Sequence, residues 1–473
     1  MRPNPSIALL PLIWILPPAC SEEPRQRPPS VILISIDTLR ADALGCYGYE
    51  RDTSPVLDRF AEEGVRFEHA IVQSTATPSS HAAMLTGVNP VVLKRGAKFP
   101  ENEQELDPLS ASYGYGLIDD LTPTIQSKLR EAGFRTAAFT AHEAWLGEKN
   151  GFHTGFDHFE TGYPPAPENL ARIEAWLESD AARPAFLFIH FYDVHSDFTD
   201  LPYRVPPPYF GKYSSGYQGS FDGRGEAGLE ASTLLQQMFK QQQRFEEAEE
   251  RYIRDLYDEG VAYMDGQMGN LFELLKQHGL YDDALVIVTS DHGEEFQEHG
   301  GLLHYQYFDE VLRVPLLIRF PGGRYQGTVV SSQVRSVDIG QTALAYCGLD
   351  PLPMSRGVSL LPLVGTGAGS VGPSFSFDGW KVAYRTDRYK LYGRWKERSL
   401  LYDLEADPGE LKDISQEQSE LTRELQGEAL KQLEDGRARG ERLADERQRA
   451  GRSIRHFSEE DLRRLAELGY TGG

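Results

Sequence analysis

Cysteine is scarce in this chain, which has three among its 473 residues. Cys46 and Cys347 lie far apart in the sequence, and neither belongs to a cluster of metal-ligating residues. This spacing excludes a disulfide framework and a cysteine-based metal site. We expect both thiols to be structural.

Positive charge is also in short supply. The 48 Lys and Arg residues face 71 Asp and Glu residues, which gives a net charge of -23 at pH 7. The sequence has no basic stretch interleaved with aromatic residues, so it argues against nucleic acid as a partner. An anionic substrate would be repelled unless a metal and local cations reverse the sign of the field at the site.

Long apolar runs are missing at the N-terminus. The stretch from Ile7 to Leu16 follows Arg2 and is too short to cross a bilayer of roughly 30 Å as a helix. We predict a signal peptide over residues 1–20 and a linker over residues 21–30. Small residues followed by Cys20 resemble a bacterial lipoprotein cleavage site, which predicts a lipid anchor on Cys20; ordinary secretion is the alternative. Either route predicts export to the periplasm or cell envelope.

Three apolar runs predict the centre of the fold. Residues 31–36, 185–189 and 284–290 are continuous and apolar, which is typical of strands buried on both faces of a parallel sheet. Between the last two, apolar residues from 253 to 275 follow helical spacing. Alternating strands and helices predict an α/β fold over residues 31–365, with a doubly wound, mostly parallel sheet flanked by helices.

Four segments break this alternation. Residues 91–118 and 196–245 are rich in Gly, Pro, Ser, Tyr and charge, and we interpret them as insertions or lids over a site. Short apolar stretches with turns between them predict a small antiparallel sheet over residues 374–412. Residues 413–473 are dense in Glu, Gln, Leu and Arg, which predicts a helical tail.

Two of the apolar runs end in residues that can bind metal. Asp37 follows the first run, and Asp291 and His292 follow the third. The carboxyl ends of parallel strands are where α/β sheets bind ligands. A single Asp in this position is more often a helix N-cap, but two such strand ends in one chain favour a shared site.

The eleven residues from Thr77 to Gly87 carry the strongest signal. They resemble the nucleophile signature of the sulfatases, Cys/Ser-x-Pro-Ser-Arg-x-x-Leu-x-Thr-Gly, a branch of the alkaline phosphatase superfamily. Counting back from Gly87 places Thr77 on the nucleophile and His81 on the Arg. The other frame places Ala76 on the nucleophile and implies a dead enzyme, but it leaves one residue too many before the Thr-Gly end.

A helix start fits the same stretch. Ser79 or Ser80 can cap a helix that begins near residue 82, and Thr77 would then lie just ahead of its positive end. That position suits an anionic ester. The resemblance implies that one divalent cation, calcium, zinc or manganese, is bound by four residues: Asp37, Thr77, Asp291 and His292.

Two later segments also resemble the family. Residues 190–195 resemble its His-x-x-x-x-His segment, whose second histidine, here His195, contacts the substrate anion. His304 stands where the family has Lys, and a neutral imidazole can bind metal whereas an ammonium cannot. Asp193, His195 and His304 are therefore candidates for a second cation site, although we favour hydrogen bonds from the two histidines to the anion. The resemblance implies a further substrate contact from His142, and catalytic roles for Thr77, His81, His195 and His304.

Threonine changes the expected chemistry. In the family's sulfatases the Cys or Ser is oxidised to formylglycine, but the methyl group on the threonine Cβ blocks this, so we expect no formylglycine. We predict a hydrolase acting on ester bonds in which Thr77 attacks sulfur or phosphorus in line and forms a covalent intermediate. Its substrate would be a small-molecule or glycan sulfate, phosphate or phosphonate ester. The alternative is a catalytically silent protein that binds sulfated or phosphorylated glycans; the sequence does not define the oligomeric state.

Overall fold

The computed structural model describes residues 28–93, 118–179, 184–196, 203, 205–218, 244–367, 369–377, 381–394 and 397–451. The predicted signal peptide with Cys20, most of both predicted insertions and the end of the predicted tail lie outside the described residues.

A nine-stranded sheet forms the centre of the molecule, in the order β10-β2-β9-β6-β1-β5-β3-β4, with β11 also pairing β2. Strand β9 is antiparallel to both of its neighbours, and the other pairings are parallel. This arrangement confirms the predicted mixed, mostly parallel sheet. The strands are β1 (Val31–Ile36), β2 (Val65–Ile71), β3 (Arg135–Phe139), β4 (His158–Glu160), β5 (Ala185–Phe191), β6 (Leu285–Thr289), β9 (Arg313–Arg319), β10 (Thr328–Val330) and β11 (Val334–Arg335).

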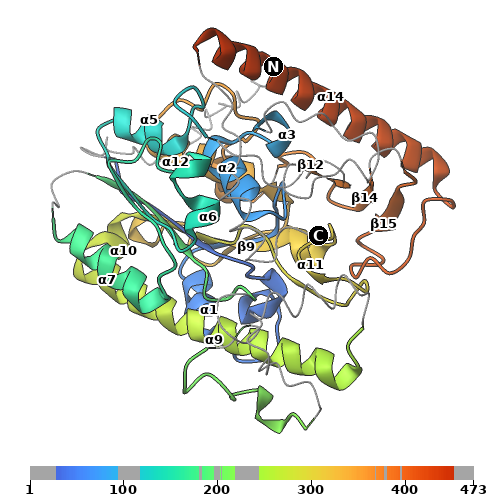
Figure 1. Cartoon of the computed structure of the whole chain (residues 1–473), viewed down its shortest axis with the longest axis horizontal. Coiled ribbons are helices and arrows are strands. Elements are labelled where there is room, and N and C mark those ends of the chain that lie inside the picture. The colour runs from blue at the N-terminus through green and yellow to red at the C-terminus, as the bar shows by residue number, and fades with distance from the viewer. Residues whose placement is uncertain are drawn as a thin grey trace, which may run out of the picture.

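Helices cover both faces of this sheet (Figure 1). Alternate residues of a strand point to opposite faces, so Val31 and Leu33 join one hydrophobic core while Ile32 and Ile34 join the other. The first face carries α2 (Thr77–Thr86), α5 (Ile125–Glu131) and α12 (Ser336–Tyr346). The second carries α1 (Pro55–Glu62), α7 (Ala166–Leu177) and α9 (Glu247–Gln277). Short helices α3 (Pro90–Leu93), α6 (Glu143–Leu146), α10 (Leu280–Asp283), α11 (Asp309–Leu312) and α13 (Leu361–Thr366), and the hairpin of β7 (Glu295–Phe296) and β8 (Leu302–Leu303), complete this part.

Two buried acidic residues of α9 accept hydrogen bonds from the backbone of neighbouring segments. The Asp265 carboxylate accepts hydrogen bonds from the first amides of α1, those of Val56 and Leu57, at 3.0 and 2.8 Å. Glu259 accepts from the amides of Gly211, Tyr213 and Ser214 at 2.8 to 3.0 Å. Both carboxylates are buried and both are satisfied by backbone donors, so the described part of the second insertion is tied to α9.

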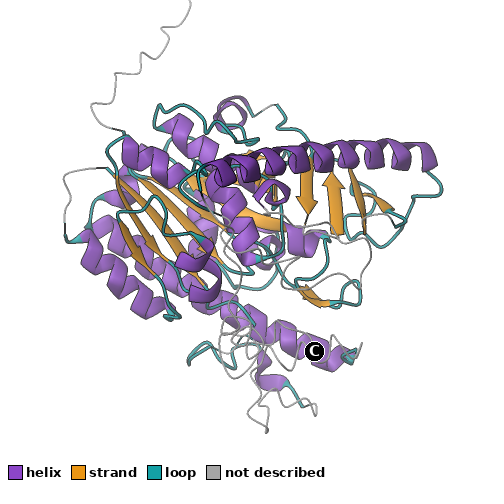
Figure 2. Ribbon diagram, turned by 45° about the horizontal axis from the view of Figure 1, so that its top comes forward, coloured by secondary structure: helices purple, strands orange, loops and turns teal. Residues whose placement is uncertain are grey.

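A four-stranded antiparallel sheet follows, as predicted (Figure 2). Its strands are β12 (Ser374–Phe377), β13 (Lys381–Arg385), β14 (Tyr389–Arg394) and β15 (Leu400–Asp403). Lys390 in β14 is fully buried, and its Nζ lies 2.9 Å from both Asp309 of the larger part and Glu410. Arg385 adds a second ion pair to Asp309 at 2.8 Å. This buried network fixes the small sheet against α11.

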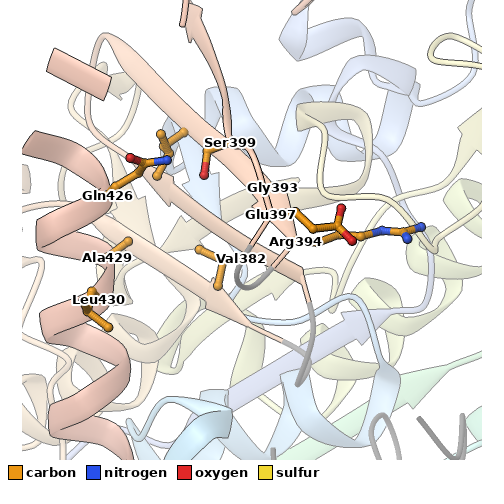
Figure 3. A pocket seen from close by; sticks show the side chains of 9 residues that line it. Val382, Gly393, Arg394, Glu397, Ser399, Gln426, Ala429 and Leu430 are labelled. Carbon is orange, nitrogen blue, oxygen red and sulfur yellow. The ribbon is translucent and has the colours of Figure 1, made fainter. Parts of the chain in front are cut away.

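The long helix α14 (Ser419–Arg449) packs on the small sheet and on α3. Gly436 allows the close approach, because a Cβ there would lie 2.2 Å from Cγ1 of the buried Val91. Nearer its start, α14 leaves a cavity of about 220 Å³ between Ala429 and Leu430 on the helix and Val382 on β13 (Figure 3). Among the described helices, none combines the length and the apolar character needed to cross a membrane.

Two alanine substitutions in α14 should have opposite effects on stability. A Cβ added at Gly427 would meet no neighbouring side chain within 4 Å, so Gly427→Ala should gain about 0.5–1 kcal/mol from helix propensity. Gly436→Ala should cost about 1–3 kcal/mol, because the new methyl overpacks against Val91. Urea unfolding of both variants measures these changes in the free energy of unfolding. Changes of the same sign in the two variants would contradict the packing of α14 described here.

Candidate functional site

Three buried side chains converge at the carboxyl ends of β1 and β6. Asp37 follows β1, Asp291 and His292 follow β6, and the parallel pairing of the two strands places these ends side by side. One ligand atom from each lies within 4.8 Å of the others. The backbone amide of Asp37 also bonds to Phe191 O of β5 at 2.9 Å, so strands on both sides fix its position.

Thr77 lies at the edge of this group as the first residue of α2. Its hydroxyl is 3.5 Å from Asp37 Oδ2 and 3.4 Å from His292 Nε2. The expectation that Ser79 or Ser80 caps the helix was wrong, because α2 begins earlier, at Thr77, with Pro78 in a first turn where proline is tolerated. The Ser80 hydroxyl instead donates to Asp291 O at 2.7 Å and joins α2 to the end of β6.

His81 supports Thr77 from within α2. Its Nδ1 lies 2.8 Å from Thr77 O, and because a carbonyl can only accept, Nδ1 carries the proton. Its Nε2 is then the acceptor for the Ser35 hydroxyl, also at 2.8 Å. Burial lowers the pKa of His81 to about 4, so the ring is neutral. Both ring nitrogens are engaged inside the protein, which suits a residue that positions Thr77.

His190 contacts the site, although the sequence analysis gave it no role of its own. It lies opposite Ser35 in the β1–β5 register. Its Nδ1 accepts from Ala141 N at 3.4 Å, so Nε2 donates to Asp37 Oδ2 at 3.0 Å. Burial lowers its pKa to about 4. The sequence feature that could have indicated this role is the position of His190 at the end of a buried apolar strand.

His304 and His195 lie next to this group, beside His292. The ring of His304 is 4.4 Å from that of His292 and 5.3 Å from that of His195, between centroids. His304 Nδ1 lies 3.4 Å from Glu294 Oε1, and because a carboxylate can only accept, Nδ1 carries a proton in this contact. Glu294 is fully buried and was missed by sequence reasoning, although it stands two residues after His292.

The two other predicted residues have structural contacts. His142 Nδ1 accepts from Trp145 N at 3.2 Å and caps α6, while its ring lies 4.6 Å from Tyr192, which stacks on His195 at 4.4 Å. Asp193 Oδ1 accepts from Ala166 N at 2.8 Å at the start of α7, and burial raises its pKa to about 7. Within the described residues, the tight metal-type group contains Asp37, Asp291 and His292 and leaves out Asp193. The second cation stays a prediction.

The first group fits a divalent cation. Asp37 Oδ1 and Asp291 Oδ2 are buried and lack hydrogen-bond partners. Burial and the charge of Asp291 raise the pKa of Asp37 to about 7. His292 Nδ1 donates to Gly293 O at 3.0 Å, so the lone pair of Nε2 faces the two carboxylates, 3.4 Å from Asp291 Oδ2. A cation between them would stabilise these carboxylates and the imidazole lone pair, which face one another in a buried space.

The fold is that of the ester hydrolases of the alkaline phosphatase superfamily. A family model described as Sulfatase matches residues 29–349, and the chain therefore belongs to the sulfatase family. This match confirms the predicted family and the predicted class of hydrolase. Enzymes of this family depend on metal, as predicted.

Relatives extend this match along the chain. It is similar to the N-acetylglucosamine-6-O-sulfatase of Bacteroides thetaiotaomicron, at 23% identity over 92% of both chains. It is also similar to the multifunctional alkaline phosphatase superfamily protein PehA of Trinickia caryophylli, at 24% identity over 82% of this chain and 91% of the relative. Among solved structures, the phosphonate monoester hydrolase of Agrobacterium radiobacter matches with a TM-score of 0.66 at 20% identity, covering 87% of this chain and 96% of that one. The shared fold confirms the predicted fold class.

Removal of divalent metal should lower both activity and stability. A ligand present at 1,000 times its Kd stabilises a fold by about 4 kcal/mol, so chelation should lower Tm by several degrees, and one divalent ion should restore it. Asp291→Asn provides the control, because chelation should then shift Tm little. An equally stable and active chelated wild type would contradict the site.

Proposed function

We propose that this protein hydrolyses sulfate, phosphate or phosphonate esters with Thr77 as the nucleophile. The observation that supports this best is the position of the Thr77 hydroxyl, 3.5 Å from Asp37 Oδ2 and 3.4 Å from His292 Nε2, at the first residue of α2. The positive end of a helix stabilises an anionic ester at this place.

Asp37, Asp291 and His292 would hold the cation, with the Thr77 oxygen beside them. A divalent cation bound there would lower the pKa of the Thr77 hydroxyl and neutralise charge on the ester oxygens. His190 keeps Asp37 oriented by its hydrogen bond at 3.0 Å, and His81 holds the backbone of Thr77. The chain's own residues thus fix the direction from which Thr77 approaches the ester.

In the first step of this proposal, the Thr77 hydroxyl has already lost its proton to solvent, and its Oγ1 alkoxide forms a bond to sulfur or phosphorus as the bond to the leaving alcohol breaks. The alcohol takes a proton from the protonated form of His195 or His304. The ring of His304 lies 4.4 Å from that of His292, and the ring of His195 lies 5.3 Å from that of His304. In the second step, water attacks the same centre, the bond to Thr77 breaks, and a histidine that has lost its proton accepts one from the water. Sulfate is released from a sulfate ester, a phosphonate from a phosphonate monoester and a phosphate monoester from a phosphate diester, and the Thr77 alkoxide is regenerated.

Phosphorus esters are the better match for a threonine nucleophile. A sulfated or phosphorylated threonine has no neighbouring hydroxyl on the same carbon through which to eliminate the anion, so its release requires attack at sulfur or phosphorus. The relatives include both a phosphonate monoester hydrolase and an N-acetylglucosamine-6-O-sulfatase. We therefore infer a phosphate diester or phosphonate ester as the preferred substrate, with glycan sulfates as the second candidate class. For an exported protein these substrates would lie outside the cytoplasm, and the N-terminal segment supports such export.

Removal of the Thr77 hydroxyl should abolish turnover. Thr77→Ala should reduce kcat by at least about 10³-fold, as expected for loss of a nucleophile. Thr77→Ser keeps the hydroxyl and should keep measurable activity. Thr75→Ala is the matched control two residues away and should stay within a few-fold of wild type. Full activity of Thr77→Ala would contradict the assignment of Thr77 as the nucleophile. Loss of activity in Thr75→Ala alone would indicate that Thr75 is the nucleophile instead.

The substrate class can be measured directly. Aryl phosphonate monoesters and phosphate diesters should turn over faster than aryl sulfates at saturating metal, and mass spectrometry should find unmodified threonine at position 77. Faster cleavage of aryl sulfates would reverse the preference. Absence of turnover on every ester, combined with binding of sulfated glycans, would favour the catalytically silent alternative.

A further inference from the structure

A second cavity lies where α14 meets the larger part of the chain. It measures about 60 Å³ and is lined by three arginines from separate segments: Arg335 before α12, Arg356 in the loop that follows it and Arg439 on α14. Elements α3, β12 and α14, which border it, lie together in Figure 1. In a chain with a net charge of -23, three guanidinium groups around one cavity are a local reversal of sign.

The acids at this cavity leave a positive excess. Arg335 is paired with the buried Asp338 at 2.8 Å. Arg356 and Arg439 share one carboxylate, that of Asp435, at 3.0 and 3.9 Å from the same oxygen. Two carboxylates therefore face three guanidinium groups, and the longer of the two contacts to Asp435 is too long for a hydrogen bond.

The groups around Arg439 also carry an excess of positive charge. Its side chain is 13% exposed, and its guanidinium also donates to Met354 O. Burial and the positive charges of Arg356 and Arg442, against the opposing charge of Asp435, lower the pKa of Arg439. A buried guanidinium with too little negative charge around it favours an added anion.

We propose that this cavity binds a tetrahedral oxyanion such as inorganic sulfate or phosphate. A cavity of about 60 Å³ has room for more than one water, and a single tetrahedral oxyanion can take the place of several waters. Planar guanidinium groups match the oxygen pairs of such an anion. This site is separate from the ester site and does not depend on the proposed reaction.

An anion bound here would connect α14 to the strand that leads to Thr77. Gln73 lines the cavity four residues before Thr77, and its Oε1 accepts from Ser336 Oγ at 2.7 Å and Val337 N at 3.1 Å. Arg439 belongs to α14, and Arg335 and Arg356 belong to the larger part. Bridging these segments should stabilise the docked position of α14.

Thermal unfolding at constant ionic strength, with sulfate or phosphate replacing chloride, tests this site. The wild-type Tm should rise with a saturable dependence on each oxyanion, whether or not metal has been chelated. Arg356→Gln, whose side chain is 61% exposed in the wild type and whose loss should not prevent folding, should raise the apparent midpoint concentration at least tenfold. Arg439→Gln should do the same. The matched control is Arg423→Gln, an exposed arginine on α14 outside the cavity, which should behave like wild type.

Three outcomes would overturn the proposal. One is the lack of a saturable rise in wild type, and another is an unchanged midpoint in Arg356→Gln, which would place the anion elsewhere, including the ester site. The third is crystals soaked in selenate with no anomalous peak between Arg356 and Arg439. The midpoint oxyanion concentration is measured without an ester substrate. A protein that fails to hydrolyse esters would therefore still test whether the cavity binds an oxyanion.

Discussion

Repulsion between the carboxylates of Asp37 and Asp291 is the constraint on which the arrangement of the surrounding polar groups depends. The parallel pairing of β1 with β6 brings two carboxylates to the same edge of the sheet, and one oxygen of each is left without a hydrogen bond in a fully buried environment. Burial and the charge of Asp291 raise the pKa of Asp37 to about 7, so the charge on Asp37 in particular needs a cation beside it. The neighbouring polar groups are arranged accordingly: His190 donates to Asp37, and the lone pair of His292 is directed inward.

The position of Thr77 depends on this same edge through the elements that contact it. Ser80 bonds to the backbone of Asp291, and His81 bonds to both Thr77 and Ser35 of β1. Helix α2 is therefore attached to both strands whose ends carry the carboxylates. Thr77 and the metal-type group are parts of one rigid unit, which preorganises them relative to each other.

The sequence predicted those features that local pattern determines. Continuous apolar runs indicated β1, β5 and β6, and the carboxyl-end rule indicated Asp37 and Asp291. His190 and Glu294 could not be assigned in this way, because their roles depend on strand register and on the path of the chain after β6. The start of α2 was misplaced because cap preference pointed to the serines, while the helix begins with Thr77-Pro78. Strand β12 has four residues and was not recognised within the predicted small sheet.

The bonds of His81 constrain how this chain could change. Its neutral ring donates to the carbonyl of Thr77 and accepts from Ser35, in a space with no exposure to solvent. An arginine, which the family signature has at this place, would bring five donors and a fixed charge into a space shaped for one donor and one acceptor. His81→Arg would therefore leave the Ser35 hydroxyl without its acceptor and place a charge in a buried space, so a change at residue 81 is coupled to Ser35.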